Sequence, residues 1–182
     1  MEPITILLSD DPPVTRQGLR FLLETAEDFQ VVGEAENGQQ SVAEAQRLRP
    51  NVVVMDLAMP VLNGVEATRL ITTAVPSVKV LILSTYTDDQ HLQQAIQAGA
   101  AGYVIKETAG DDLSTAIREV HKGNAFFSPL ISTARWEQQP ECDFGSQTTN
   151  PDGLTMPQME ILQLMAEGQT IIQTNGTHYA SK

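Results

Sequence analysis

Residues 4–11 read ITILLSDD and residues 52–56 read VVVMD, two short apolar runs that each end in aspartate. Their hydrophobicity is continuous rather than alternating, which is typical of strands buried on both faces of a parallel sheet. Three other runs have the same character. The predicted strands are therefore 4–8, 30–33, 52–55, 78–83 and 102–105.

The stretches between these strands have the spacing of amphipathic helices. Leu113, Ala116, Ile117 and Val120 would share one helical face, for example. Five strands alternating with five helices predict a doubly wound α/β domain. In such folds, ligands bind outside the carboxyl ends of the strands, so the residues that follow each strand are the candidates for function.

The composition excludes several other classes of protein. The 182 residues carry 11 Lys and Arg against 23 Asp and Glu, a formal net charge of −12. This charge argues against long-range electrostatic capture of nucleic acid or anionic lipid. The single cysteine, Cys142, excludes an internal disulfide framework and a Cys-rich zinc site. With neither a signal peptide nor an apolar stretch of membrane-spanning length, the chain is expected to be soluble, cytoplasmic and not bound to a membrane.

The composition changes once along the chain, near residue 123. Residues 1–123 hold the predicted α/β domain, whereas residues 124–153 are rich in Gly, Pro, Ser, Thr, Gln and Asn and read as a linker. A further segment, 154–182, opens with a predicted helix whose N-cap is Thr155 and whose capping-box partner is Gln158. It is expected to be a short helical remnant.

Polar residues gather at the predicted strand ends. Asp10 and Asp11 follow the first strand, Asp56 the third, Ser84 the fourth and Lys106 the fifth. Crowded carboxylates resist full ionisation unless a cation joins them, and an all-oxygen site with open positions favours Mg²⁺. An aspartate beside such an ion can attack phosphorus to form an aspartyl phosphate.

These residues closely resemble a known family over about residues 3–125. The chain is similar to the receiver domains of bacterial two-component response regulators of the NarL/LuxR type. The motifs that carry the resemblance are Ser9-Asp10-Asp11, Met55-Asp56-Leu57-Ala58-Met59-Pro60, Asn63-Gly64, Leu83-Ser84-Thr85 and Ala98-Gly99-Ala100-Ala101-Gly102-Tyr103-Val104-Ile105-Lys106. Residues 16–19 and 117–123 point to the subfamily. The resemblance implies a flavodoxin-like, five-stranded parallel sheet in the order 2-1-3-4-5.

The resemblance also implies roles for the strand-end residues. Asp56 would accept the phosphoryl group, and Lys106 would pair with one of its oxygens. Mg²⁺ would be held by Asp11, Asp56 and the backbone carbonyl of Ala58, with Asp10 acting mainly through water. The protein would then be a phosphoacceptor in signalling rather than an enzyme.

Two further residues would belong to the switch that the family uses. Ser84 would move toward the phosphoryl group, and Tyr103 would change rotamer with it. In such a switch, a new charge at one site favours one of two conformations nearby. The implied partners are a sensor histidine kinase and, after phosphorylation, a second copy of the chain. One departure is Pro12-Pro13, where relatives usually have His after the Asp pair.

The C-terminal segment resembles only part of a LuxR-type helix-turn-helix. Residues 153–168 are similar to its opening helix, but residues 170–182 match none of the later ones. Arg135 and Lys182 are the only basic residues of 123–182, against six acids. Because a DNA reader needs Lys or Arg for phosphates, DNA output is not expected from this incomplete remnant, although DNA binding is typical of the lineage.

Three alternatives remain at this point. A DNA-binding regulator could keep its output through a residual C-terminal element, and its DNA complex would weaken steeply with salt. A hydrolase with an aspartyl-phosphate intermediate would turn over a phosphate ester, but such enzymes usually place a second Asp at the position of Ala58. A flavin-binding module would need phosphate-cradling glycines or hydroxyls that no loop offers.

Overall fold

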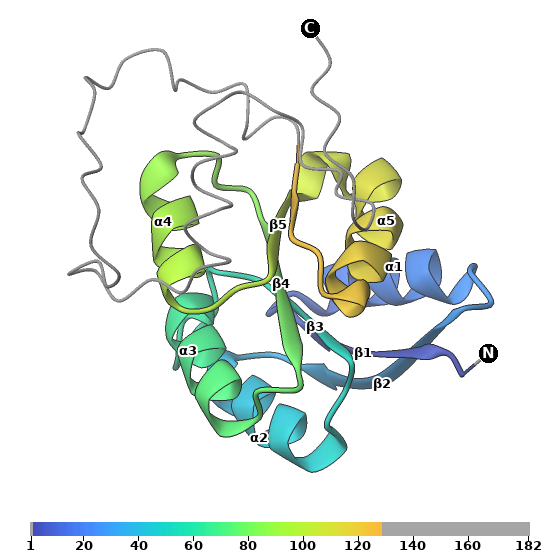
Figure 1. Ribbon diagram of the computed structural model, residues 1–182, viewed down its shortest axis with the longest axis horizontal. Coiled ribbons are helices and arrows are strands. Elements are labelled where there is room, and N and C mark those ends of the chain that lie inside the picture. The colour runs from blue at the N-terminus through green and yellow to red at the C-terminus, as the bar shows by residue number, and fades with distance from the viewer. Residues whose placement is uncertain (1, 129–182) are drawn as a thin grey trace, which may run out of the picture.

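The order of strands and helices follows directly from the alternation in the sequence. A computed structural model of the chain describes residues 2–128 and shows strands alternating with helices (Figure 1). The strands are β1 Ile4–Ser9, β2 Phe29–Ala35, β3 Val52–Met55, β4 Lys79–Ser84, β5 Gly102–Ile105 and β6 Phe126–Phe127. The helices are α1 Pro13–Glu24, α2 Gly38–Leu48, α3 Gly64–Ala74, α4 Asp89–Gln97 and α5 Ala109–Lys122, with a 3₁₀ turn η1 at Lys106–Thr108.

All strand pairs are parallel, and the sheet has the order β2-β1-β3-β4-β5-β6. The predicted doubly wound fold and the order 2-1-3-4-5 are therefore confirmed. The sheet has one strand more than predicted, because Phe126 and Phe127 pair with Gly102 and Tyr103 at the edge beyond β5. A two-residue strand is too short to produce a hydrophobic pattern in the sequence. For this reason the predicted linker, 124–153, includes these two residues.

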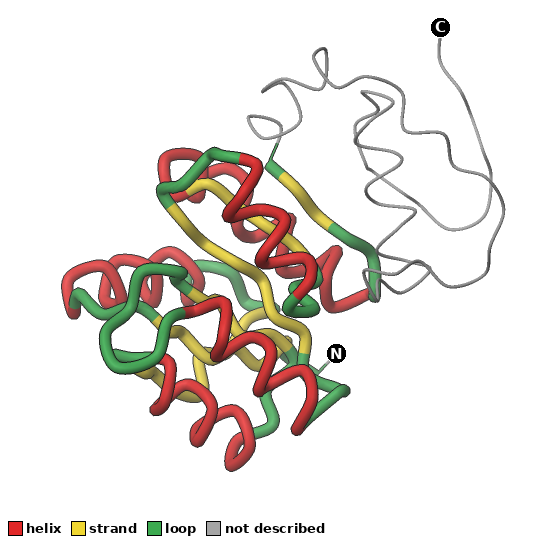
Figure 2. Tube along the Cα trace, turned by 90° about the vertical axis from the view of Figure 1, so that its left-hand side faces the viewer, coloured by secondary structure: helices red, strands yellow, loops and turns green. Residues whose placement is uncertain are grey.

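Helices cover both faces of the sheet (Figures 1 and 2). Along β1, Ile6 and Leu8 face a core shared with α1 and α5, whereas Leu7 faces a second core shared with α2, α3 and α4. This two-sided burial is the physical reason for the continuous apolar runs in the sequence. It also leaves the strand ends as the part of the sheet that polar residues can occupy.

The described residues contain no helix long and apolar enough to cross a membrane. The predicted linker beyond residue 128 and the predicted C-terminal helical remnant lie outside these residues, and so does Cys142.

Candidate functional site

The parallel sheet brings the predicted site residues to one edge. Asp10 and Asp11 follow β1, Asp56 follows β3, Ser84 ends β4 and Lys106 follows β5. Because β1, β3, β4 and β5 are neighbours in that order, their carboxyl ends lie side by side.

Three carboxylates and one ammonium group form the centre of this edge. Carboxylate oxygens of Asp10, Asp11 and Asp56 lie within 4.8 Å of one another. Asp10 and Asp56 are buried, whereas Asp11 is exposed. The Lys106 Nζ lies 2.7 Å from Oδ2 of Asp10 and 3.2 Å from Oδ1 of Asp56. One positive charge therefore faces three negative ones.

The charges of the cluster depend on one another. Burial raises the pKa of Asp10, and this effect, with the charges of Asp56 and Asp11, outweighs the opposing effect of Lys106. Burial alone would lower the pKa of Lys106, but the carboxylates of Asp10 and Asp56 raise it overall. Lys106 is therefore held as a cation, and its single positive charge does not balance the three carboxylates of the cluster.

Asp10 indicates what would supply that missing charge. Both of its carboxylate oxygens are buried, and neither forms a hydrogen bond of good geometry within the described residues, although Lys106 approaches one of them as an ion pair. A buried carboxylate without hydrogen bonds is costly. Together with two neighbouring carboxylates, the buried oxygens of Asp10, of which only Oδ2 is paired with Lys106, are the kind of ligand set that Mg²⁺ prefers, so the residues present fit a magnesium ion.

The backbone around Asp56 is tightly fixed. The Asp56 N–H donates to the carbonyl of Ser9 at 2.8 Å, and the N–H of Gly64 donates to the carbonyl of Leu57 at 2.9 Å. A Cβ added at Gly64 would lie only 2.0 Å from the carbonyl oxygen of Asp56. The first turn of α3 therefore packs directly on the aspartate, and Ala58 lies exposed in the connecting loop.

Ser84 and Tyr103, the predicted switch residues, are both buried and are linked through Tyr86. The Tyr86 N–H donates to Oγ of Ser84 at 3.1 Å, and the Tyr103 hydroxyl donates to the carbonyl of Tyr86 at 2.9 Å. Burial raises the pKa of Tyr103 to about 12. The loop after β4 thus connects Ser84, at the acidic cluster, with the hydroxyl of Tyr103 on the neighbouring strand β5.

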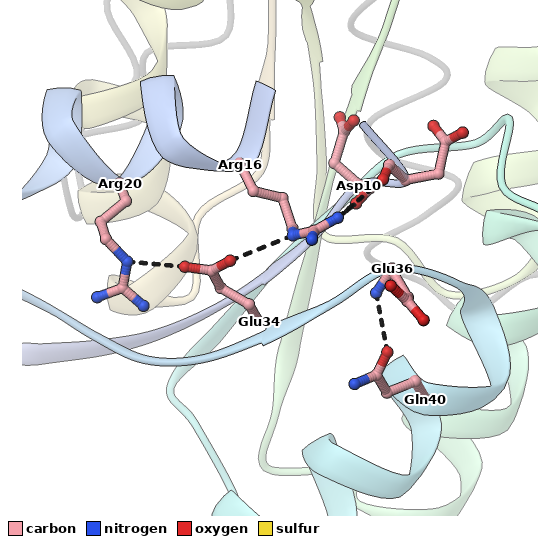
Figure 3. A network of polar contacts seen from close by, with 7 residues as sticks. Asp10, Arg16, Arg20, Glu34, Glu36 and Gln40 are labelled. Carbon is pink, nitrogen blue, oxygen red and sulfur yellow. Dashed lines mark hydrogen bonds and ion pairs between the residues drawn. The ribbon is translucent and has the colours of Figure 1, made fainter. Parts of the chain in front are cut away.

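The sequence analysis used Arg16 only as part of a subfamily motif and gave no role to Glu34, although the two side chains are linked to this site. Arg16 of α1 donates hydrogen bonds to the backbone carbonyls of Asp10 and Asp11, and Glu34 of β2 holds Arg16 (Figure 3). Arg16 lies five residues after Asp11, more than a helical turn away, and the sequence alone gives no sign that its side chain turns back toward the strand end.

Comparisons with known proteins agree with this geometry. Residues 6–118 match the response regulator receiver domain family. The chain is 35% identical over 171 residues to the transcriptional regulatory protein LnrK of Bacillus subtilis (strain 168), covering 91% of this chain and 78% of LnrK. It is 33% identical over 165 residues to the response regulator protein VraR of Staphylococcus aureus (strain NCTC 8325 / PS 47), covering 91% and 77% of the two chains.

A solved structure shows the same fold. The LuxR-family two-component response regulator from Aurantimonas sp. SI85-9A1 superposes with a TM-score of 0.69 at 34% sequence identity, over 72% of this chain and 94% of that one. The family match covers more than half of the chain and includes all the strand-end residues described above. The chain therefore belongs to the response regulator receiver family, and it is a two-component response regulator of the LuxR/NarL type.

Proposed function

We propose that Asp56 is the phosphoacceptor of this response regulator and that a sensor histidine kinase supplies the phosphoryl group. The observation that carries the proposal is the position of Asp56: it is a buried carboxylate in a cluster of three, with the Lys106 ammonium at 3.2 Å. The predicted domain 1–123 contains every residue of this cluster.

In the proposed reaction, a carboxylate oxygen of Asp56 attacks phosphorus. The bond from phosphorus to the donor nitrogen breaks, the donor keeps the electron pair, and an acyl phosphate forms on Asp56. Lys106 is placed to pair with an oxygen of the transferred group, because its Nζ already contacts the carboxylate that reacts.

Asp10, Asp11 and Asp56, with the backbone carbonyl of Ala58, would hold a magnesium ion at this edge. The bound ion would supply positive charge against the developing charge on the phosphoryl oxygens. The buried oxygens of Asp10, which among the described residues have only the Lys106 ion pair, support this assignment. Asp11 is exposed, which leaves the cluster open to solvent and to a donor.

The same proposal gives Ser84 and Tyr103 the role of reporting the reaction. Ser84 ends the strand between β3 and β5 and is hydrogen-bonded to the Tyr86 backbone, which also accepts from Tyr103. A new negative group on Asp56 would compete for the Ser84 hydroxyl and so disturb the loop at Tyr86. The ring of Tyr103 would then lose or change its hydrogen-bond partner.

Intact-mass measurement tests the proposal. The full chain is incubated with a small acyl phosphate donor, with and without Mg²⁺, beside Asp56→Asn and the control Asp111→Asn. Asp111 is an exposed carboxylate in the first turn of α5, so its variant makes the same chemical change away from the site.

A Mg²⁺-dependent gain of one phosphoryl group is expected in the unmodified chain and in Asp111→Asn but not in Asp56→Asn. No gain in the unmodified chain would contradict the proposal, and so would a gain in Asp56→Asn. Continuous release of phosphate from a phosphate ester would instead support the hydrolase alternative.

A further inference from the structure

The side chain of Arg16 reaches back from α1 to the turn that carries the acidic pair. Its Nη1 donates to the carbonyl oxygen of Asp10 at 2.7 Å and to that of Asp11 at 2.8 Å. Its Nε donates to Oε2 of Glu34 on the edge strand β2 at 3.2 Å, and the side chain is only 13% exposed (Figure 3). One guanidinium group thus joins a helix, a turn and a strand.

The turn that leads into α1 has no hydrogen-bonding cap of its own. The N-cap position of α1 is Pro12 and the first helical residue is Pro13, so neither contributes an N–H, and no side chain caps the helix. Each of the next three helices has a side-chain cap, because the side chains of Asn37, Asn63 and Asp88 accept a hydrogen bond from a backbone N–H in the first turn. The Arg16 side chain does not replace such a cap, since it only donates, but its hydrogen bonds to the Asp10 and Asp11 carbonyls tie the turn to the first turn of α1.

Arg16 binds the backbone carbonyls of the acidic pair rather than its carboxylate oxygens. Within residues 2–128 its guanidinium contacts the two carbonyl oxygens and Glu34, whereas the carboxylate of Asp10 has only the ion pair with Lys106. The charge of Arg16 is also opposed by Glu34 rather than left to compete with a cation at the cluster. Arg16 therefore orders the backbone of Asp10 and Asp11 while their carboxylates remain available to a cation.

From this geometry we propose that Arg16 is a positioning residue for the magnesium site, an inference that rests on the function proposed above. By fixing both carbonyls, Arg16 fixes the backbone from which Asp10 and Asp11 project. The two carboxylates then need little ordering when the ion binds, and a preorganised site binds more tightly than one that must order first.

Arg16→Lys tests the geometry rather than the charge. Lysine keeps the positive charge, but its single ammonium group lacks the planar fork that lets Arg16 reach the carbonyls and Glu34 together. Arg20→Lys is the matched control: Arg20 is on the same helix and pairs with the same Glu34 at 2.8 Å, but its other contact is Glu24, away from the acidic pair. Both variants are made in the full chain.

The primary measurement is calorimetric titration with Mg²⁺, in the absence of any phosphodonor. We expect the Mg²⁺ dissociation constant of Arg16→Lys to rise about 10-fold, the lower end of the effect of losing a group that orients metal ligands. The constant for Arg20→Lys should stay at the value of the unmodified chain. The rise in urea midpoint that Mg²⁺ produces should shrink in Arg16→Lys alone, which gives a second measure of binding to the folded chain.

The Mg²⁺ dependence of phosphorylation separates positioning from a general loss of structure. In Arg16→Lys, half-maximal rate should require about 10-fold more Mg²⁺, while the rate at saturating Mg²⁺ stays close to that of the unmodified chain, since a bound ion restores the order.

Two results would overturn the inference about Arg16: an unchanged Mg²⁺ dissociation constant in Arg16→Lys, whatever its rate at saturating Mg²⁺, or an equal change of the constant in Arg16→Lys and Arg20→Lys. If the unmodified chain itself takes up no Mg²⁺, the proposed function fails, and the inference fails with it.

Discussion

Gly64→Ala is the substitution whose effect can be worked out most directly from the structure. The added Cβ would lie 2.0 Å from the carbonyl oxygen of Asp56 and 2.8 Å from Cα of Leu57, and both neighbours are backbone atoms that cannot rotate away. Either the first turn of α3 or the Asp56–Leu57 backbone must therefore move by about 1.4 Å, from 2.0 Å to the 3.4 Å at which ordinary contact begins.

This movement should lower both stability and reactivity. Forcing a methyl group into a packed site costs about 1–3 kcal/mol, and distorting the hydrogen bond from the Gly64 N–H to the Leu57 carbonyl adds about 1 kcal/mol. The free energy of unfolding should then fall by about 2–4 kcal/mol, a large share of the roughly 5–15 kcal/mol typical of a native domain. Because Asp56 moves relative to Lys106, phosphorylation should slow by up to about 10²-fold.

Urea unfolding and the intact-mass assay measure the two effects, and Gly18→Ala is the control. A Cβ at Gly18, within α1, would meet no atom within 4 Å, so this variant should gain about 0.5–1 kcal/mol from its higher helix propensity. If Gly64→Ala unfolds at the same urea midpoint as Gly18→Ala, the close approach of α3 to Asp56 is not present in solution and the reasoning is refuted.

Three other substitutions give separate tests. Hydrogen bonding from Arg20, more than the opposing effect of burial, lowers the pKa of Glu34 from its ordinary 4.5. Glu34→Gln should therefore lower the free energy of unfolding by about 1 kcal/mol at neutral pH. This difference from the unmodified chain should disappear as the pH falls below 4.5, which urea unfolding at several pH values would check. Because burial raises the pKa of Tyr103 from 10.0 to about 12, unfolding of the unmodified chain should become easier between these two pH values, and Tyr103→Phe should remove that component; an identical alkaline profile would contradict it. Ser128→Ala should cost about 1–3 kcal/mol in urea unfolding, since the buried Ser128 Oγ accepts from the Ile105 N–H and donates to Asp112, and no loss would show that these contacts are dispensable.

The candidate site was predictable where position along the chain determines position in space. In a parallel sheet every strand enters from the same side, so residues that follow β1, β3 and β5 must meet at one edge whatever the details of packing. Asp10, Asp56 and Lys106 could therefore be assigned together from their places after apolar runs, and the structure brings their side chains within contact distance.

Arg16 and Ser128 could not be predicted in this way. An arginine on the first turns of a helix usually points to solvent, and only the direction of the chain between β1 and α1 returns its side chain to the carbonyls of the acidic pair. Ser128 follows a strand of two residues and reads as linker, but β6 lies against β5 and buries it.

The parallel α/β fold and the placing of acidic and basic residues at the strand ends could be predicted from the sequence, because buried strands need continuous apolar runs and the polar residues can only follow them. The contacts of Lys106 with both Asp10 and Asp56, and those of Arg16 with the turn, emerge only when the chain is folded. Those features depend on differences of about an ångström between side chains far apart in the sequence, and no local pattern of residues encodes them.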